Sequence, residues 1–352
     1  MKLLLPLAWI YSSVMAFRNW LFDHGYKSQQ SFDLPIISVG NLAVGGTGKT
    51  PHTEYLLRLL TDLGKQCVML SRGYGRKTKG YHEAKGGKPE DVGDEPWQVQ
   101  TKFPEVEVCV CEKRVVGIER ILSKHHPDII LLDDAYQHRY VKPGLSVMLT
   151  EYGRPYFSDY VMPAGRLREN RKGAQRADII IVTKCPDNLS ATQRDTFRQR
   201  IAPLPHQKVF FTYFDYGNIY PFGEPGSGKK TDTLLTLEDK KALLLCGIAR
   251  PKNLIDYLRP QCKSLDVANF RDHHNFTDKE IDELGERAKA YDKVVTTEKD
   301  AARLAGYNLP ESLRQRLLVQ PIEVKFINNE SQEFNKIIID YVTENSRNRS
   351  VD

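Results

Sequence analysis

The chain has 352 residues, of which 40% are hydrophobic and 27% charged, and its formal net charge is +6. This length favours about two domains of roughly 100–200 residues each, and the composition is that of a core-forming globular protein. The mildly basic balance suits an anionic substrate, a membrane surface or nucleic acid. Because no nucleic-acid module and no basic helix with interleaved aromatic residues is present, we expect no nucleic-acid partner.

The six cysteines indicate a reducing compartment. Most of them lie in apolar runs that predict buried strands, where a thiol is usually reduced and structural. Cys109 and Cys111 share one face of a predicted strand, but no second pair of ligands follows, so we expect no zinc site.

Residues 1–28 predict a hydrophobic helix at a membrane. The run from Leu3 to Phe17 is mostly apolar, and Trp20 and Phe22 continue it. It is shorter than the ~20 apolar residues that a spanning helix needs, so a helix lying in the membrane interface fits it best. Two alternatives remain open, namely a signal peptide cleaved after Ala16 and a helix packed on the protein body.

Residues 29–207 predict a doubly wound α/β domain, because short apolar runs alternate with amphipathic segments. Leu56, Leu59, Leu60 and Leu63 form one face of a helix. The runs are continuously apolar, which is typical of buried parallel strands. These predicted strands are 34–39, 66–70, 106–110, 129–132, 145–149 and 179–183.

The remaining chain predicts a smaller α/β domain at 237–352, preceded by an inter-domain β linker at 208–236. In this smaller domain we predict a helix at Thr277–Tyr291 and a last helix carrying Phe334 and Ile338. The predicted strands of this half are 209–214, 242–246, 294–297 and 317–326.

The strongest motif is a glycine-rich loop that follows the first predicted strand and precedes the first amphipathic helix, which is the context of a P-loop. Backbone N–H groups of such a loop approach phosphate oxygens at a helix N-terminus. Lys49 is expected to reach the β- and γ-phosphates of ATP, and the Thr50 hydroxyl to bind Mg²⁺. The full pattern has Gly where this chain has Ala43. The predicted phosphate-binding residues are Gly45, Gly46, Thr47, Gly48, Lys49 and Thr50.

A second glycine-rich stretch, Gly223–Lys230, satisfies the outer spacing of the same motif. It ends in Lys230 where a metal-binding hydroxyl is required, and no convincing helix follows. We therefore interpret it as a solvated loop between domains.

The apolar strand 129–132 ends in Asp133 and Asp134, which is how these folds place a carboxylate near Mg²⁺. Gln137 follows just beyond the strand end, where ligands lie in open α/β sheets.

Asp94, in the sequence Gly-Asp-Glu-Pro, has two readings from the residues alone. It is either the N-cap of a helix with Pro96 in its first turn, or a carboxylate that accepts a proton from a substrate hydroxyl. Asp272 and His273 also have two possible interpretations. They form either a catalytic pair or an ordinary polar turn, and their spacing favours the turn.

Three further residues are weaker candidates. Arg72 follows a predicted strand, where it is placed to bind an anionic group, and Arg168 and Glu169 supply a cation and a carboxylate near a metal.

Eight ordered motifs between about residues 34 and 304 together resemble the tetraacyldisaccharide 4′-kinase family. The family usually has Gly-Phe where this chain has Ala135-Tyr136. The motifs are GNLAVGGTGKTP at 40–51, LSRGYG at 70–75, GDEP at 93–96, DDAYQH at 133–138, PAGRLRE at 163–169, ADIIIVTK at 177–184, RDHHNF at 271–276 and TTEKDAARL at 296–304.

The resemblance implies a P-loop kinase that uses ATP and Mg²⁺ to phosphorylate the 4′-hydroxyl of a lipid A precursor, a tetraacyl-disaccharide 1-phosphate. It implies that Asp94 is the catalytic base and that His273, from the smaller domain, is its partner. Lys49 is expected to act on the phosphates, and domain closure to assemble the site. The expected metal-side residues are Thr50, Asp133 and Glu169, and the expected substrate-side residues are Arg72, Asp134, Gln137 and Arg168.

The same resemblance implies a protein at the cytoplasmic face of the inner membrane of a Gram-negative bacterium, with no obligate protein partner. Two other classes remain possible from the residues. One is a P-loop nucleotide switch docked on a membrane, and the other is a P-loop kinase for a soluble metabolite.

Overall fold

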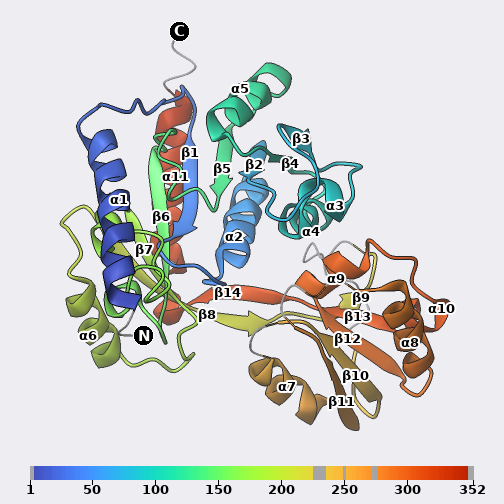
Figure 1. Ribbon diagram of the computed structural model, residues 1–352. Helices are drawn as coiled ribbons and strands as arrows, with labels where there is room; N and C mark the ends of the chain where they lie inside the picture. The colour runs from blue at the N-terminus through green and yellow to red at the C-terminus, as the bar shows by residue number, and fades with distance from the viewer. Residues whose placement is uncertain (1–3, 225–234, 249–250, 272–273, 275, 348–352) are drawn as a thin grey trace.

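The computed structural model describes residues 4–224, 235–248, 251–271, 274 and 276–347, which form two units, each built on one sheet (Figure 1). The larger sheet has nine strands in the order β14-β8-β7-β6-β1-β5-β2-β4-β3. The smaller has five, in the order β11-β10-β12-β13-β9.

The centre of the larger sheet is parallel and fully buried, as the continuous apolar runs predict. Short antiparallel strands lie at its two ends, β3 (His82–Glu83) beside β4 and β14 (Ile322–Phe326) beside β8. The parallel strands are β1 (Ile36–Asn41), β2 (Cys67–Ser71), β4 (Glu107–Val110), β5 (Ile129–Asp133), β6 (Leu145–Glu151), β7 (Ile179–Thr183) and β8 (Lys208–Tyr216).

Helices cover both faces of this sheet, which confirms the doubly wound architecture. α2 (Lys49–Asp62), α4 (Asp94–Lys102) and α11 (Ser331–Arg347) pack on one face. α5 (Arg114–Lys124) and α6 (Ala191–Ile201) pack on the other. Two more helices belong to this unit, α1 (Leu5–Asp23) and the short α3 (Pro89–Val92).

The predicted apolar face of α2 is largely confirmed. Leu56 and Leu60 are buried, and Leu57 joins them in the core. Leu63 is 47% exposed because the helix ends at Asp62, so this leucine lies beyond its last turn.

The smaller unit has a sheet with four parallel strands and one antiparallel edge strand, β9, next to β13. Helix α7 covers one face, and α8, α9 and α10 contribute to the core on the other (Figure 1). The strands are β9 (Tyr220–Pro221), β10 (Lys241–Cys246), β11 (Ser264–Asn269), β12 (Lys293–Thr297) and β13 (Leu317–Gln320). The helices are α7 (Lys252–Leu258), α8 (Asp278–Ala288), α9 (Glu298–Leu304) and α10 (Glu311–Arg314).

The predicted single strand at 317–326 is two strands in two different sheets. Pro321 separates β13 from β14, because proline cannot donate a ladder hydrogen bond. β14 then pairs with β8 of the larger sheet, and the α11 side chains Phe334 and Ile338 enter the larger core. Residues 322–347 therefore belong to the larger unit, contrary to their predicted place in the smaller domain.

The predicted β linker at 208–236 is also divided between the units. β8 extends the larger sheet, whereas β9 pairs in the smaller one. An apolar run predicts a strand but does not show which sheet the strand joins.

Helix α1 packs on the larger unit through Ala8 and Phe22, which are its buried apolar side chains. Tyr11 donates a hydrogen bond to the Arg168 carbonyl (3.1 Å), and Arg18 donates one to the Gln137 carbonyl (3.1 Å). Within the described part of the chain, no helix combines the length and apolarity needed to cross a membrane.

Candidate active site

The glycine-rich loop lies between β1 and α2, as predicted. Gly48 is the N-cap of α2 with φ +90°, and Lys49 and Thr50 begin the helix. A Cβ at Gly48 would lie 2.5 Å from the Phe214 ring. The loop therefore holds its backbone N–H groups at a helix N-terminus, which is a ready site for phosphate.

Residues at the ends of three neighbouring strands stabilise this loop through hydrogen bonds. From β1, the Asn41 amide donates to the Thr47 hydroxyl (2.7 Å), and from β7 the Thr183 hydroxyl donates to the Thr47 carbonyl (2.8 Å). The Lys184 ammonium donates to the Gly46 carbonyl and to Glu151 at the end of β6 (2.8 Å). This bracing fixes the loop before any ligand binds. In the sequence, Lys184 appears only as the last residue of the motif ADIIIVTK.

Asp133, at the end of β5, is buried beside the loop. Its two oxygens accept hydrogen bonds from Thr53 of α2 (3.3 Å) and Ser71 of β2 (3.5 Å). Burial and the neighbouring charges of Glu95 and Asp134 raise the pKa of Asp133 to about 7. A buried carboxylate that shares its surroundings with two others is suited to a cation.

Asp134 faces the P-loop lysine. Its carboxylate lies 3.7 Å from the Lys49 ammonium and 3.0 Å from the Arg168 guanidinium. Burial opposes the charged form, but Lys49 and Arg168 outweigh it and hold the pKa of Asp134 below its ordinary value. Lys49, Asp134 and Arg168 thus lie close together beside the loop, and their predicted roles stay predictions.

Glu169 is almost fully buried, and both of its oxygens are engaged. They accept hydrogen bonds from Asn19 (2.7 Å), Gln137 (3.1 Å) and both terminal nitrogens of Arg176 (3.0 and 2.8 Å). Arg176 already neutralises this carboxylate, so the contacts favour a positioning role that joins α1 to the loop after β5. Its predicted role as a metal ligand stays a prediction.

Asp94 is the first residue of α4, and the N-cap is Gly93, so the N-cap reading of Asp94 is wrong. Its side chain is 37% exposed, and one carboxylate oxygen lies 3.3 Å from Nε of Arg303, in α9 of the smaller unit. Asp272 and His273 lie outside the described residues, so the predicted Asp94–His273 pair stays a prediction.

His138, next to Gln137, is subject to the charges of three arginines. Burial, then the charges of Arg114, Arg18 and Arg72, lower the pKa of His138 to about 4. Arg72 is exposed at the end of β2, where an anionic group can reach it. Tyr136, the departure from the family pattern, donates to the Gly173 carbonyl (2.7 Å) and so has a structural role.

The sequence reasoning missed Glu95, Arg18 and Arg303 as site residues. Glu95 and Arg303 both lie inside the quoted motifs, adjacent to Asp94 and within TTEKDAARL respectively. Arg18 lies outside these motifs, between Phe17 and Trp20 of the N-terminal apolar segment. Of the second glycine-rich stretch, residues 225–230 lie outside the described part of the chain.

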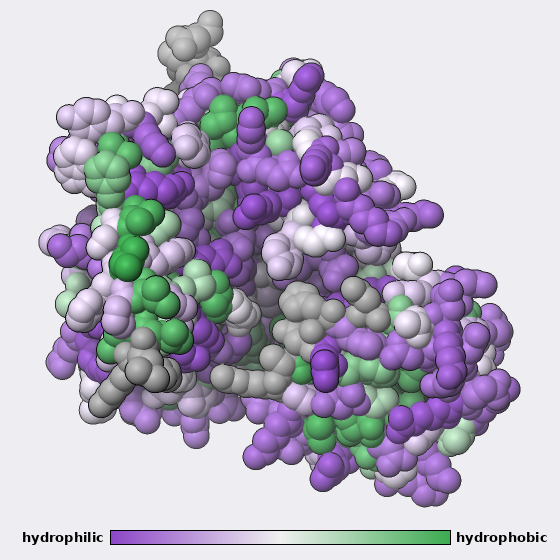
Figure 2. Space-filling view, in the orientation of Figure 1, coloured by the Kyte–Doolittle hydropathy of each residue, from purple (hydrophilic) through white to green (hydrophobic). Residues whose placement is uncertain are grey.

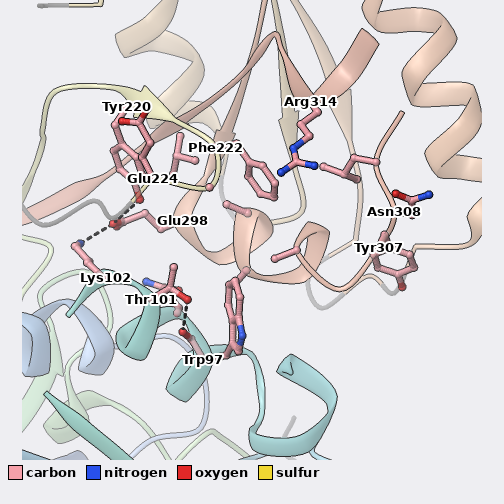
Figure 3. A pocket seen from close by; sticks show the side chains of 17 residues that line it. Trp97, Thr101, Lys102, Tyr220, Phe222, Glu224, Glu298, Tyr307, Asn308 and Arg314 are labelled. Carbon is pink, nitrogen blue, oxygen red and sulfur yellow. Dashed lines mark hydrogen bonds and ion pairs between the residues drawn. The ribbon is translucent and has the colours of Figure 1, made fainter. Parts of the chain in front are cut away.

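A cavity of about 230 Å³ lies between α4 and the smaller unit (Figure 3). Trp97 and Thr101 line it from α4, opposite Phe222 and Arg314. At one side Lys102 pairs with Glu298 of α9 at 2.6 Å, so the two units contact each other through a buried ion pair.

A braced glycine-rich loop at the start of a helix, with a buried acidic strand end beside it, defines a P-loop nucleotide-binding protein. The family model for "Tetraacyldisaccharide-1-P 4'-kinase" matches residues 1–343. The chain belongs to this family.

Relatives named tetraacyldisaccharide 4'-kinase include those of Bacteroides fragilis, 44% identical over 99% of this chain and 95% of the relative, and Flavobacterium johnsoniae, 43% identical over 98% of each. The crystal structure of LpxK from Aquifex aeolicus in complex with ATP is similar, with a TM-score of 0.75 and 28% identity. The structural match covers 97% of this chain and 99% of the Aquifex aeolicus chain.

Proposed function

We propose that this kinase transfers the γ-phosphate of ATP to the 4′-hydroxyl of a tetraacyl-disaccharide 1-phosphate, with Asp94 as the general base. The observation that carries the base assignment is the position of Asp94 and Glu95. Asp94 is partly exposed at the start of α4, while the charge of the adjacent Glu95 acts on buried Asp133. The base candidate therefore adjoins the acidic edge of the P-loop.

In the proposed step Asp94 takes the proton of the 4′-hydroxyl as its oxygen forms a bond to the γ-phosphorus. The bond from the γ-phosphorus to the β,γ-bridging oxygen breaks, and ADP leaves with that oxygen. The backbone N–H groups of Gly45–Thr50 and the Lys49 ammonium hold the phosphates and their developing charge.

The residues present fit Mg²⁺. Magnesium in kinases is usually held through one or two carboxylates and the substrate phosphates, and Asp133 and the Thr50 hydroxyl supply such donors beside the loop. Among the described residues no group of three His, Cys, Asp or Glu side chains stands ready to hold a metal alone, which agrees with a site completed by the nucleotide. Bound Mg²⁺ supplies charge neutralisation at the phosphates.

On the substrate side we propose that the sugar and its 1-phosphate contact Arg72, Arg168 and Gln137. Asp134 holds Arg168 in place at 3.0 Å. The cations Arg18 and Arg114 near His138 extend this positive region toward α1.

The acyl chains are proposed to stay in the membrane, on which α1 rests. Trp9, Ile10 and Phe17 of α1 are 61–68% exposed, and Figure 2 shows apolar side chains gathered along this helix. Such a face suits the membrane interface. We propose the cytoplasmic side of the inner membrane, because ATP and a lipid precursor meet there.

The direct test incubates purified protein with labelled ATP, Mg²⁺ and detergent-dispersed tetraacyl-disaccharide 1-phosphate. Product phosphorylated at the 4′ position is expected, and its absence overturns the proposal. Asp94→Asn keeps the shape of the side chain but removes the base, so kcat is expected to fall by about 10²–10⁴ with ATP binding retained. If Asp94→Asn transfers phosphate at the wild-type rate, the base assignment is wrong.

A further inference from the structure

Arg303 reaches from the smaller unit to the proposed base. It belongs to α9, which packs against α4, and its Nε lies 3.3 Å from Oδ2 of Asp94. The two residues are 209 positions apart in the sequence. This contact joins the two units at the N-terminal end of α4, where the chemistry is proposed to occur.

The Arg303 guanidinium is itself held in place. Its Nη1 donates to Asp300 (2.9 Å) and to the Gly247 carbonyl (3.3 Å). Asp300 in turn accepts from the Gly247 N–H (2.9 Å) and from the Thr297 hydroxyl (2.8 Å). The arginine is therefore anchored to the end of β10 and the first turn of α9, so its direction toward Asp94 is fixed.

Arg303 and Asp300 form a buried ion pair, whereas Asp94 is partly exposed. The side chains of Arg303 and Asp300 are 5% and 1% exposed, whereas that of Asp94 is 37% exposed. Asp300 already compensates the buried guanidinium, so Arg303 does not need Asp94 for its own neutralisation. A buried, charge-compensated arginine that donates to a partly exposed carboxylate orients that carboxylate.

The contact also leaves part of Asp94 available. The hydrogen bond from Arg303 goes to Oδ2, and the Asp94 side chain is 37% exposed. A carboxylate that is held at one oxygen and still accessible is suited to accept a proton in a defined direction.

We infer that Arg303, braced by Asp300, is a positioning residue that holds Asp94 in its reactive orientation and does so from the smaller unit. The inference rests on the proposed function, in which Asp94 is the base. It makes the base of the larger unit depend on a residue that the smaller unit supplies, so correct docking of the two units is a condition for phosphate transfer.

The test measures kcat and KM for ATP and lipid in Arg303→Met, Arg303→Lys and Asp300→Asn, with the melting temperature of each. Arg303→Met is expected to lower kcat about 10–100-fold with KM for ATP unchanged, since a misplaced catalytic group costs on this order. Arg303→Lys is expected to recover part of the loss. Arg194→Met, which removes a buried arginine of the larger unit, controls for the general effect of losing one.

The deciding measurement repeats Arg303→Met in the Asp94→Asn background, with long incubations to detect the residual transfer. If Arg303 acts through Asp94, the second substitution is expected to add less than about a twofold loss. If Arg303→Met does not fold, the double variant Arg303→Met/Asp300→Asn is used in its place, because it removes both buried charges. This variant is then compared in the wild-type and Asp94→Asn backgrounds. A wild-type kcat in folded Arg303→Met, or an equal fold loss in both backgrounds, overturns the inference. A wild-type protein that makes no 4′-phosphorylated product overturns the proposed function instead.

Discussion

Gly48 is constrained both by its backbone and by its neighbours. Its φ of +90° is one that residues with a Cβ rarely adopt, and an added methyl group would meet the Phe214 ring at 2.5 Å. Gly46 lies in the same loop, but a Cβ there meets nothing within 4 Å. The two glycines therefore form a matched pair for testing the loop.

Gly48→Ala is expected to weaken ATP binding more than Gly46→Ala, because the strain of about 1–2 kcal/mol displaces the first turn of α2. Isothermal titration with an ATP analogue and Mg²⁺ measures both affinities, and circular dichroism checks that both variants fold. Equal affinities for the two variants would show that the conformation of Gly48 does not set the phosphate site.

At the residue scale, the sequence predicts what local context determines. Lys49 and Thr50 follow from a strand-loop-helix pattern, and Asp133 from an apolar strand that ends in acid. The contacts that orient these groups join residues far apart in the chain, such as Lys184 with Gly46 and Arg303 with Asp94. No spacing rule reports such contacts, because they depend on which strands become neighbours.

At the scale of elements, α1 has two faces with different functions. Ala8 and Phe22 are buried against the larger unit, whereas Trp9 and Phe17 are exposed by 68% and 61%. Asn19 and Arg18 on the same helix reach Glu169 and the Gln137 carbonyl. The helix therefore connects the proposed membrane surface to the proposed substrate side of the site.

Replacing Trp9 and Phe17 together by Asn is expected to reduce binding to anionic lipid vesicles about tenfold or more, since burying each large apolar side chain contributes about 1.5–3 kcal/mol. Thermal stability is expected to stay unchanged, because both side chains are already exposed. Vesicle sedimentation and melting curves measure the two effects. Tyr74→Asn, an 82% exposed aromatic residue outside α1, is the control, and an equal loss of binding there would contradict the role of α1.

The sequence predicts the positions of the strands better than it predicts which strands pair with each other. Most strands are close to their predicted ranges, because a run of apolar residues between turn signals is a local property. The division of 317–326 at Pro321 was missed, since proline is also tolerated at an edge, and only the pairing of β14 with β8 shows that the chain changes sheets.

At the scale of the whole molecule, one buried group of charges joins the two units. Lys102 of α4 lies 2.6 Å from both Glu54 of α2 and Glu298 of α9, and all three side chains are at most 6% exposed. Two carboxylates share a single ammonium. Burial and the charge of Glu54 raise the pKa of Glu298 to about 7, and the opposing effect of Lys102 does not cancel this.

This group makes stability depend on pH. The folded pKa of Glu298, about 7, exceeds its ordinary value of 4.5, so its stabilising contribution is complete below pH 4.5 and is lost as the pH rises through 7. Glu298→Gln cannot ionise. Between pH 5 and pH 8 the wild type is expected to lose roughly 1–3 kcal/mol more of its free energy of unfolding than this variant does.

Urea unfolding at several pH values measures the difference. Glu105→Gln, at an exposed position, is the control and is expected to follow the wild type. Parallel curves for the wild type and Glu298→Gln would show that Glu298 is ionised throughout this range.

The chain passes from the larger unit to the smaller unit and back at a single place. The chain leaves the larger sheet after β8 and returns to it in β14, and the Gly217 N–H donates to the Pro321 carbonyl at 3.2 Å (Figure 1). Exit and return points are thus hydrogen-bonded neighbours. The smaller unit is topologically an insertion into a β8–β14 hairpin, as a domain grafted into an existing fold would be. Because the exit and return points are neighbours, the smaller unit interrupts the hairpin without changing the order of the strands in the larger sheet.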